Sequence, residues 1–229
     1  MTPTHTDKAY EQELKDLRDR LLAMGGKVEA AIAASVTAVT ERDVAAAERV
    51  KANDLEVNRM EVGIDNACRR LLALRQPAAS DLRFITTALK IVTDLERMGD
   101  LAVNIAERAI DLAGAPPLGP MHDLAALADL SQAQLQRALG SFVERDAAKG
   151  EEVIRGDAAL DALYLKIFND LLALMMEDSR AIRRATALMF VAKHLERFGD
   201  HATNVGEMVV YMVRGTDVRH PASREAATP

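Results

Sequence analysis

An internal repeat is the feature that most constrains how this 229-residue chain can fold. The segment Leu95-Glu-Arg-Met-Gly-Asp100 recurs as Leu195-Glu-Arg-Phe-Gly-Asp200, at an offset of 100. Glu41-Arg-Asp43 recurs as Glu144-Arg-Asp146, but at an offset of 103. About one helical turn was therefore gained or lost inside the second helix of a unit. The repeat predicts two copies of one structural unit.

Each copy is expected to consist of three helices. Aromatic residues make up only 3% of the chain and Trp is absent, so the apolar residues are mainly those that favour close helix packing. The predicted helices cover residues 8–40, 44–75 and 80–113 in the first copy and 121–143, 147–177 and 180–213 in the second. Short connections make successive helices antiparallel. The predicted fold is all-α, with two tandem homologous three-helix bundles.

Gly and Pro mark the boundary between the copies. No helix can cross Gly114-Ala-Pro-Pro-Leu-Gly-Pro120, so residues 114–120 are predicted to link a first unit, 1–113, to a second unit, 121–213. Residues 214–229 lose the helical periodicity and gain Pro, Ser and Thr, which predicts a flexible tail.

Small polar residues mark the predicted starts of helices. Asp43 and Asp146 are suitable N-caps for the second helix of each unit, and Ser80 and Ser179 are suitable caps for the third. Pro77 is expected to enforce the break before the third helix of the first unit.

Charge and hydropathy exclude several classes of protein. A net charge of -6 without a concentrated basic segment argues against nucleic-acid binding. The polar segment 1–14 does not resemble a signal peptide, and the uninterrupted apolar runs are much shorter than the roughly 20 residues that span a bilayer. Any membrane contact is therefore expected to be peripheral. The single cysteine, Cys68, lies among apolar residues and is interpreted as a buried packing thiol rather than a reactive one.

Acidic residues form stripes beside the apolar face of two helices in each copy. At about 100 degrees per residue, Glu96, Asp100 and Glu107 share a stripe, with Asn104 at its margin. The preceding helix carries a second stripe, made of Asp54, Asn58, Glu61 and Asp65. The second copy has corresponding residues at Asp157, Asp161, Glu196 and Asp200, whereas Tyr164 replaces Glu61.

These stripes are expected to bind metal. Like charges one turn apart destabilise a helix by about 0.2–0.5 kcal/mol per pair, and two facing stripes add repulsion that a cation would relieve. Carboxylate and amide oxygens suit hard ions such as iron, manganese, magnesium or calcium. The alternative is that the stripes are solvated helix flanks paired with Arg97 and Arg197. His194 and His201 face away from the stripe, and no E-x-x-H motif is present, so zinc and ferritin-like di-iron sites are less suitable.

Motifs that would indicate catalysis are missing. The sequence has no G-x-x-x-x-G-K-[ST], G-x-G-x-x-G or G-x-S-x-G segment. The duplicated acidic sets also have no dedicated nucleophile or phosphate clamp beside them. A non-catalytic regulator that acts by binding is favoured; the alternatives are a metal-dependent enzyme, such as a phosphohydrolase, and a purely structural helical spacer.

The repeated L-E-R-[hydrophobic]-G-D motif, followed by Asn and an acidic residue, resembles the PhoU family. The links Arg75-Gln-Pro77 to Ser80-Asp-Leu-Arg83 and Met175-Met-Glu-Asp-Ser-Arg180 strengthen the resemblance, which covers roughly residues 10–213. It implies a cytoplasmic, often dimeric, non-enzymatic regulator that represses phosphate-starvation signalling when phosphate is plentiful. The implied partners are the ATPase of the phosphate ABC transporter and a sensor histidine kinase, both reached from the cytoplasmic side of the inner membrane.

The resemblance also implies metal ligands. The E/D-x-x-x-D motifs of the family match three pairs here: Glu96 with Asp100, Asp157 with Asp161, and Glu196 with Asp200. The fourth pair departs from the motif, because Asn58 follows Asp54 where a second Asp is expected. Metal binding by the first bundle is therefore less secure, and no metal is expected to be catalytic.

Overall fold

The computed structural model describes residues 8–118 and 122–218, and within these ranges every long element is a helix and none is a strand. The helices are α1 (Lys8–Glu41), α2 (Val44–Arg75), α3 (Ala79–Leu112), α4 (His122–Glu144), α5 (Ala147–Glu177) and α6 (Ile182–Arg214), with a 3-10 turn, η1 (Ser179–Ala181), before α6. These bounds confirm the predicted all-α fold and lie within about two residues of the predicted ranges.

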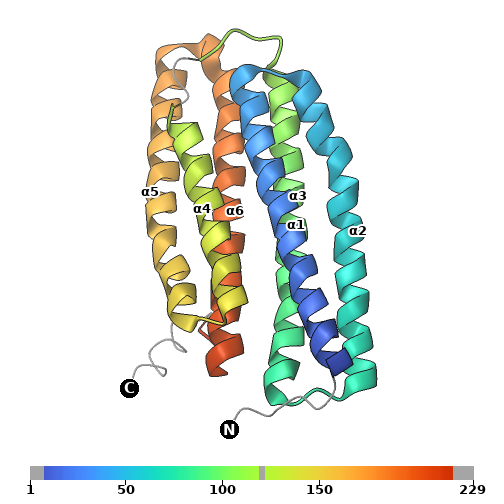
Figure 1. The fold of residues 1–229 in the computed structure, drawn as a ribbon. Helices are drawn as coiled ribbons and strands as arrows, with labels where there is room; N and C mark the ends of the chain where they lie inside the picture. Colours follow the sequence, from blue (N-terminus) through green and yellow to red (C-terminus); the bar gives the residue numbers. More distant parts are fainter. Residues whose placement is uncertain (1–7, 119–121, 219–229) are drawn as a thin grey trace.

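The helices form two three-helix units that lie side by side. Figure 1 shows α1, α2 and α3 on one side and α4, α5 and α6 on the other, with all six axes running nearly along the long dimension of the molecule. The units meet mainly where α3 packs against α6, and α1 also contacts α4. Because successive helices are antiparallel, α3 and α6 run in opposite directions along this interface.

One apolar core passes through both units. Leu21, Ile91 and Leu195 are fully buried and belong to the same cluster of packed side chains, although they come from α1, α3 and α6. Glycines permit a close approach of α5 to α6: a Cβ atom built on Gly150 would lie 2.9 Å from the carbonyl oxygen of Gly206. A side chain at Gly150 would therefore push α5 away from α6.

The helix starts confirm two predicted caps and correct two others. Asp43 accepts a hydrogen bond from the backbone N of Ala46 at 2.9 Å, and Asp146 accepts from Ala148 at 2.8 Å, as expected for N-caps. The predictions for Ser80 and Ser179 are wrong. Ala78 is the N-cap of α3 and makes no side-chain bond, whereas η1 is capped by the carboxylate of the residue preceding Ser179.

Helix α1 is long and apolar enough to cross a membrane, although its uninterrupted apolar runs are short. In this structure, however, 44% of its most apolar 18-residue segment is buried inside the protein. Leu17, Met24 and Ile32 are at most 1% exposed in the core. The apolar character of α1 is therefore explained by packing against the helices around it.

Two further predictions concern Cys68 and the tail. Cys68 is fully buried in the core, as predicted, and burial raises the pKa of its thiol to about 12. Helix α6 ends at Arg214, and Gly215 adopts the left-handed conformation that commonly terminates helices. Val218 then packs on Ala147 and Val210, so the predicted flexible tail begins with an ordered segment. Residues 219–229, residues 119–120 of the predicted linker and residue 121, the predicted start of the second unit, lie outside the described ranges.

Candidate metal centre

Three carboxylates of the second unit converge on one point. Asp157 and Asp161 lie one turn apart on α5, and Asp200 faces them from α6. One oxygen from each lies within 4.8 Å of the others, which is the spacing of ligands that share one hard cation. We call these residues the second carboxylate cluster. It is the only group with this geometry among the described residues.

A short hydrogen-bond relay orients Asp157. Gln134 on α4 is 3% exposed and its Nε2 donates to the backbone oxygen of Val153 at 3.2 Å and to Oγ1 of Thr203 at 3.4 Å. Thr203 in turn donates to Oδ1 of Asp157 at 3.1 Å. Gly156 makes room for Gln134, because a Cβ there would lie 2.8 Å from the amide oxygen of Gln134. Groups that fix a ligand in this way tune metal affinity strongly.

Glu196 belongs to the same region but already has a partner. Lys193, one turn earlier on α6, lies 2.6 Å from one oxygen of Glu196 and 2.7 Å from the other. The ammonium group of Lys193 also lies 5.3 Å from the ring centre of Tyr164 on α5. The structure therefore places Glu196 beside the second carboxylate cluster, in an ion pair rather than among the three converging carboxylates.

The electrostatics of the second carboxylate cluster favour a bound cation. The pKa of Asp200 is raised to about 6, first by burial and then by the negative charges of Glu196 and Asp157. Burial also raises the pKa of Asp157, and Asp161 and Glu196 raise it further, against the hydrogen bond from Thr203. A hard cation would stabilise the ionised carboxylates and remove this cost, so the donor set fits the metal that the sequence predicts.

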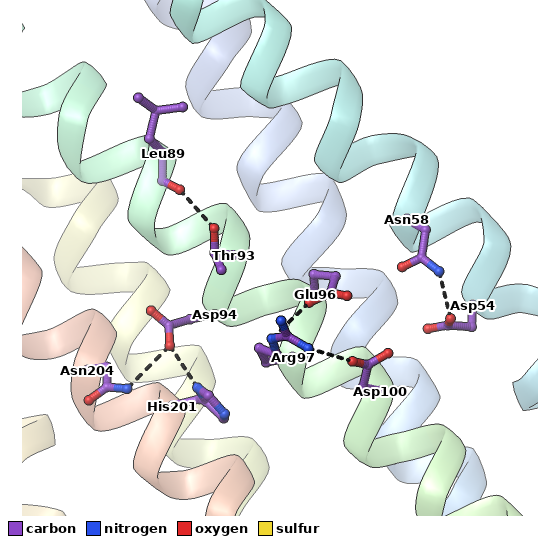
Figure 2. Close-up of polar contacts among 10 residues, drawn as sticks. All are labelled: Asp54, Asn58, Leu89, Thr93, Asp94, Glu96, Arg97, Asp100, His201 and Asn204. Carbon is purple, nitrogen blue, oxygen red and sulfur yellow. Dashed lines mark hydrogen bonds and ion pairs between the residues drawn. The ribbon is translucent and has the colours of Figure 1, made fainter.

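The corresponding residues of the first unit form a looser arrangement. Figure 2 shows Asp54 and Asn58 on α2 facing Glu96 and Asp100 on α3. Nδ2 of Asn58 donates to Oδ2 of Asp54 at 2.9 Å. Arg97 lies 3.4 Å from an oxygen of Glu96 and 3.4 Å from an oxygen of Asp100. We call these four oxygen-bearing residues, Asp54, Asn58, Glu96 and Asp100, the first cluster.

Two oxygen atoms of the first cluster still lack a donor. Oδ1 of Asp54 and Oδ1 of Asn58 are buried and have no hydrogen-bond partner among the described residues. Burial raises the pKa of Asp54 despite the hydrogen bond from Asn58, and burial followed by the charge of Asp100 raises the pKa of Glu96. A cation could satisfy both orphaned oxygens. Arg97 partly neutralises the cluster, as the alternative of solvated, paired flanks predicted.

The packing behind the two clusters differs. Applying the repeat offsets, Ala31 corresponds to Gln134 and Val103 corresponds to Thr203. In the first unit these smaller or apolar side chains leave a cavity of about 360 Å³ that Asp54 also lines. Where the second unit has the relay that orients Asp157, the first unit therefore has an open pocket lined by both apolar and polar side chains.

Several members of the predicted stripes lie outside both clusters. Asp65 pairs with Arg69 at 2.7 Å on its own helix, and Glu107 pairs with Arg108 at 3.7 Å. Glu61 stays close enough for its charge to raise the pKa of Glu96. The predicted stripes therefore do not act as single units. The four residues of the first cluster face one another, whereas Asp65 and Glu107, further along α2 and α3, form local ion pairs.

His201 and a buried aspartate belong to the interface between the units. Figure 2 shows Asp94 on the opposite side of α3 from the first cluster, facing α6. Nδ1 of His201 lies 2.7 Å from Oδ1 of Asp94, and Nδ2 of Asn204 donates to the same oxygen at 3.3 Å. His201 thus faces α3 and lies away from the acidic stripe, as predicted. Glu207 is also buried on this side of α6, away from the second carboxylate cluster.

Sequence reasoning missed Gln134, Thr203 and Lys193. Comparing the copies position by position could have found them, because each replaces a residue that cannot play the same role: Ala31, Val103 and Thr93. Figure 2 shows Thr93 donating to the backbone oxygen of Leu89 at 3.2 Å. Divergence between otherwise similar copies was the available signal.

Comparisons with known proteins agree with this architecture. A PhoU domain model matches residues 21–109 and again 124–209. The chain is 43% identical over 218 residues to the phosphate-specific transport system accessory protein PhoU homolog of Pseudomonas putida, covering 94% of this chain and 85% of that protein. The homolog of Pseudomonas aeruginosa is also 43% identical over 218 residues, covering 94% of this chain and 90% of that one.

Solved structures show the same similarity in three dimensions. The crystal structure of PhoU from Pseudomonas aeruginosa has a TM-score of 0.86 and 42% identity, and the match covers 90% of this chain and all of that one. The phosphate transport system regulatory protein PhoU from Streptococcus pneumoniae also has a TM-score of 0.86, with 29% identity over 92% of this chain and all of that one. Two matched repeats, close relatives over nearly the whole chain and the shared fold lead to one conclusion: this chain belongs to the PhoU family.

Proposed function

We propose that this chain is a cytoplasmic regulator of phosphate homeostasis that represses phosphate-starvation signalling and modulates phosphate uptake. The observation that carries the proposal is the match over 94% of the chain to relatives named phosphate-specific transport system accessory proteins. In this proposal the chain binds the ATPase of a phosphate ABC transporter and a sensor histidine kinase. It reaches the inner membrane through these partners.

The exposed surface supports action by binding. Leu165, Leu172 and Met176 are 56%, 42% and 82% exposed on α5, and their spacing of seven and four residues places them on one face of the helix. Exposed apolar side chains aligned in this way are typical of an interface. This face of α5 is suited to a partner protein or to a second copy of the chain, which would form the homodimer that the family resemblance implies.

The proposal assigns a structural role to metal. A hard ion such as iron, manganese, magnesium or calcium would be held by Asp157, Asp161 and Asp200, and a weaker site would use the first cluster. When bound, the ion supplies positive charge that holds α5 against α6. Because the carboxylates are duplicated between copies and Thr203 serves only to orient one of them, we do not assign them to catalysis. Metal-dependent hydrolysis of a phosphate ester by the purified chain, lost in Asp200→Asn, would contradict this part.

A deletion strain tests the regulatory function directly. Without the chain, phosphate-starvation genes should stay expressed in high phosphate, and a plasmid copy should restore repression. The variants Leu172→Ser and Met176→Ser change only exposed positions of α5. If this face contacts a partner, they should fail to restore repression and should recover less ATPase or kinase in a pull-down, while melting at the unmodified temperature. Normal repression in the deletion strain would overturn the proposed function.

A further inference from the structure

The interface between the units contains two grooves that the repeat relates to each other. One lies where the start of α3 meets the end of α6, is about 120 Å³ in volume and is lined by Thr86, Lys90, Glu207, Met208, Tyr211 and Asp217. The other lies where the end of α3 meets the start of α6 and is larger, about 450 Å³. We call it the arginine groove, because Arg108, Arg183 and Arg184 line it.

The repeat shows that charge and size differ at equivalent positions. Arg108 in the arginine groove corresponds to Met208 in the smaller groove, and Phe190 corresponds to Lys90. In the smaller groove, Lys90 lies 5.9 Å from the ring centre of Tyr211, so its charge is already placed on an aromatic face. The arginine groove instead concentrates positive charge around an open space. The copies diverge here although their helices pack in the same manner.

Two of the three arginines have charge to offer a ligand. Arg108 is neutralised locally, since Nη1 lies 3.0 Å from Asp111. Arg184 donates to the backbone oxygens of Pro116 at 2.9 Å and Arg180 at 3.4 Å, which positions its guanidinium. The nearby carboxylate of Asp178 interacts with this charge at longer range but is already paired with Arg180 at 2.9 Å. Arg183 forms no ion pair with any residue in the described parts of the chain. The groove therefore presents a surplus of about two positive charges.

An aromatic surface completes the groove. Phe190 lines it and is 52% exposed, an unusual position for a large apolar side chain. The ring is supported from behind by His194, whose ring centre lies 6.5 Å away at an interplanar angle of 26°. A flat apolar ring that is held by a neighbour and open on its other face is suited to stacking with a second ring.

We propose that the arginine groove binds a nucleoside di- or triphosphate, with the phosphates paired to Arg183 and Arg184 and the base stacked on Phe190. Guanidinium groups match phosphate oxygens in geometry and charge. The groove volume lies within the range of small-molecule sites, whereas inorganic phosphate alone would leave most of it and the Phe190 ring unused. The proposal goes beyond the regulatory function proposed above and does not depend on it.

Calorimetric titration of the full chain with ADP and ATP, in the presence of chelator, tests the site. Inorganic phosphate, pyrophosphate and adenosine serve as probes for the parts of the ligand. We expect ADP and ATP to bind, pyrophosphate to bind more weakly and adenosine alone not to bind measurably. Affinity should also fall as salt is raised, because the arginines are near the surface. No heat from ADP or ATP at millimolar concentration would overturn the proposal.

Matched variants locate the site. Arg183→Gln changes an exposed side chain and leaves the contacts of Arg184 with the linker intact, so the fold should be preserved; ADP affinity should fall about tenfold or more. Phe190→Ala should weaken ADP but not pyrophosphate. Lys90→Gln, the matched change in the smaller groove, should leave the affinities for ADP and pyrophosphate unchanged.

Two results would reject the nucleotide. Equal losses of ADP affinity in Lys90→Gln and Arg183→Gln would show unspecific charge attraction. Equal affinities of the unmodified chain for pyrophosphate and ADP would show a site for phosphate groups alone.

Discussion

The two carboxylate clusters occupy equivalent positions in the two repeats, yet only one has converging carboxylates. In the second unit, Thr203 donates a hydrogen bond to Asp157 and is itself bonded to Gln134. The carboxylate of Asp161 converges with that of Asp157. In the first unit, Asn58 takes the place of Asp161 and bonds to Asp54, while a cavity replaces the relay. The second unit thus has the three converging carboxylates that a cation would need, whereas the first unit has an amide–carboxylate hydrogen bond within α2.

The difference also shows where each repeat places positive charge. In the first unit, Arg97 lies on the outer side and reaches both Glu96 and Asp100. In the second unit, Lys193 forms an ion pair with Glu196 and attracts Asp200 only at longer range. Arg97 therefore contacts both carboxylates of the first cluster on α3, whereas Lys193 is within ion-pair distance of only one of the two carboxylates on α6. The remaining charge on Asp200 is the reason to expect a metal in the second unit first.

The largest expected effect is loss of metal-dependent stability in the second unit. A cation that binds only the folded chain adds about 2.7 kcal/mol at a hundredfold excess over its Kd, or about 5–10 °C in Tm for a protein of this size. Glu196→Gln combined with Asp200→Asn should abolish this gain and leave the metal-free protein equally stable or slightly more stable, because repulsion is removed. Thermal unfolding with manganese, magnesium, iron or chelator measures it.

The matched change in the first cluster is Glu96→Gln combined with Asp100→Asn. It should reduce the metal-dependent gain by much less, since Arg97 already neutralises part of the charge of these carboxylates. Equal losses from both double variants would erase the contrast between the clusters. If metal does not change the Tm of the unmodified chain, all of these residues are ordinary solvated residues on the helix flanks.

The next largest effect is expected from Thr203→Val, which gives α6 the residue that α3 has at Val103. Asp157 loses the donor 3.1 Å away, so its carboxylate is less well oriented and its metal affinity should fall about 10–100-fold. Metal titration measures the change in Kd. Thr203→Ser, which retains the hydroxyl group, is the control and should keep most of the affinity. If Thr203→Val binds metal normally, the relay has no role in holding the ligand.

The sequence predicted the parts of this arrangement that depend on periodicity. Helix bounds, the caps Asp43 and Asp146 and the meeting of Asp157, Asp161 and Asp200 all follow from spacing along single helices or from the register of two copies. Partners across helices were harder to predict. Gln134 lies 69 residues from Thr203, and no local pattern in α4 marks it, because its role depends on the packing of three helices.

The capping errors have a similar cause. Ser80 follows a proline break and is a favourable residue for a helix start, but α3 already begins at Ala79, with Ala78 as its N-cap. Before α6, the chain instead forms a 3-10 turn over Ser179–Ala181. Helix ends depend on how the connecting segment reaches the next helix, which the spacing of polar residues alone does not determine.

A smaller effect is expected from pH in the metal-free chain. The pKa of Asp200 is about 6 when folded and 3.8 as its ordinary value, so the folded state holds a proton more tightly between these values. Stability should therefore decrease as pH rises from about 4 to about 6, by about 1–2 kcal/mol once the partial exposure of the carboxylate is considered. Chemical denaturation at several pH values, with chelator, measures this slope.

Asp200→Asn should remove that contribution to the slope, whereas Asp129→Asn, at an exposed position of α4, should leave it in place. Saturating metal should also suppress it, because the cation replaces the proton. An unchanged slope in Asp200→Asn would show that the titration of other groups governs this range and that Asp200 is well solvated when ionised.

The smallest expected effect comes from Asn58→Asp, which makes the first cluster resemble the second carboxylate cluster. The change replaces the hydrogen bond from Asn58 to Asp54 with two like charges one turn apart. The metal-free chain should lose about 0.5–1 kcal/mol in its free energy of unfolding. In exchange, α2 acquires the paired aspartates that α5 has, so the metal-dependent gain in Tm should increase and a second equivalent of cation should appear in titration. Asn58→Leu, which removes the hydrogen bond without adding charge, separates the two contributions: it should destabilise the chain without any gain in metal binding. If the stoichiometry of metal binding is unchanged in Asn58→Asp, the missing aspartate is not what limits the first unit. The cavity beside Asp54 and the ion pairs of Arg97 would then explain why it does not bind the cation proposed for the second unit.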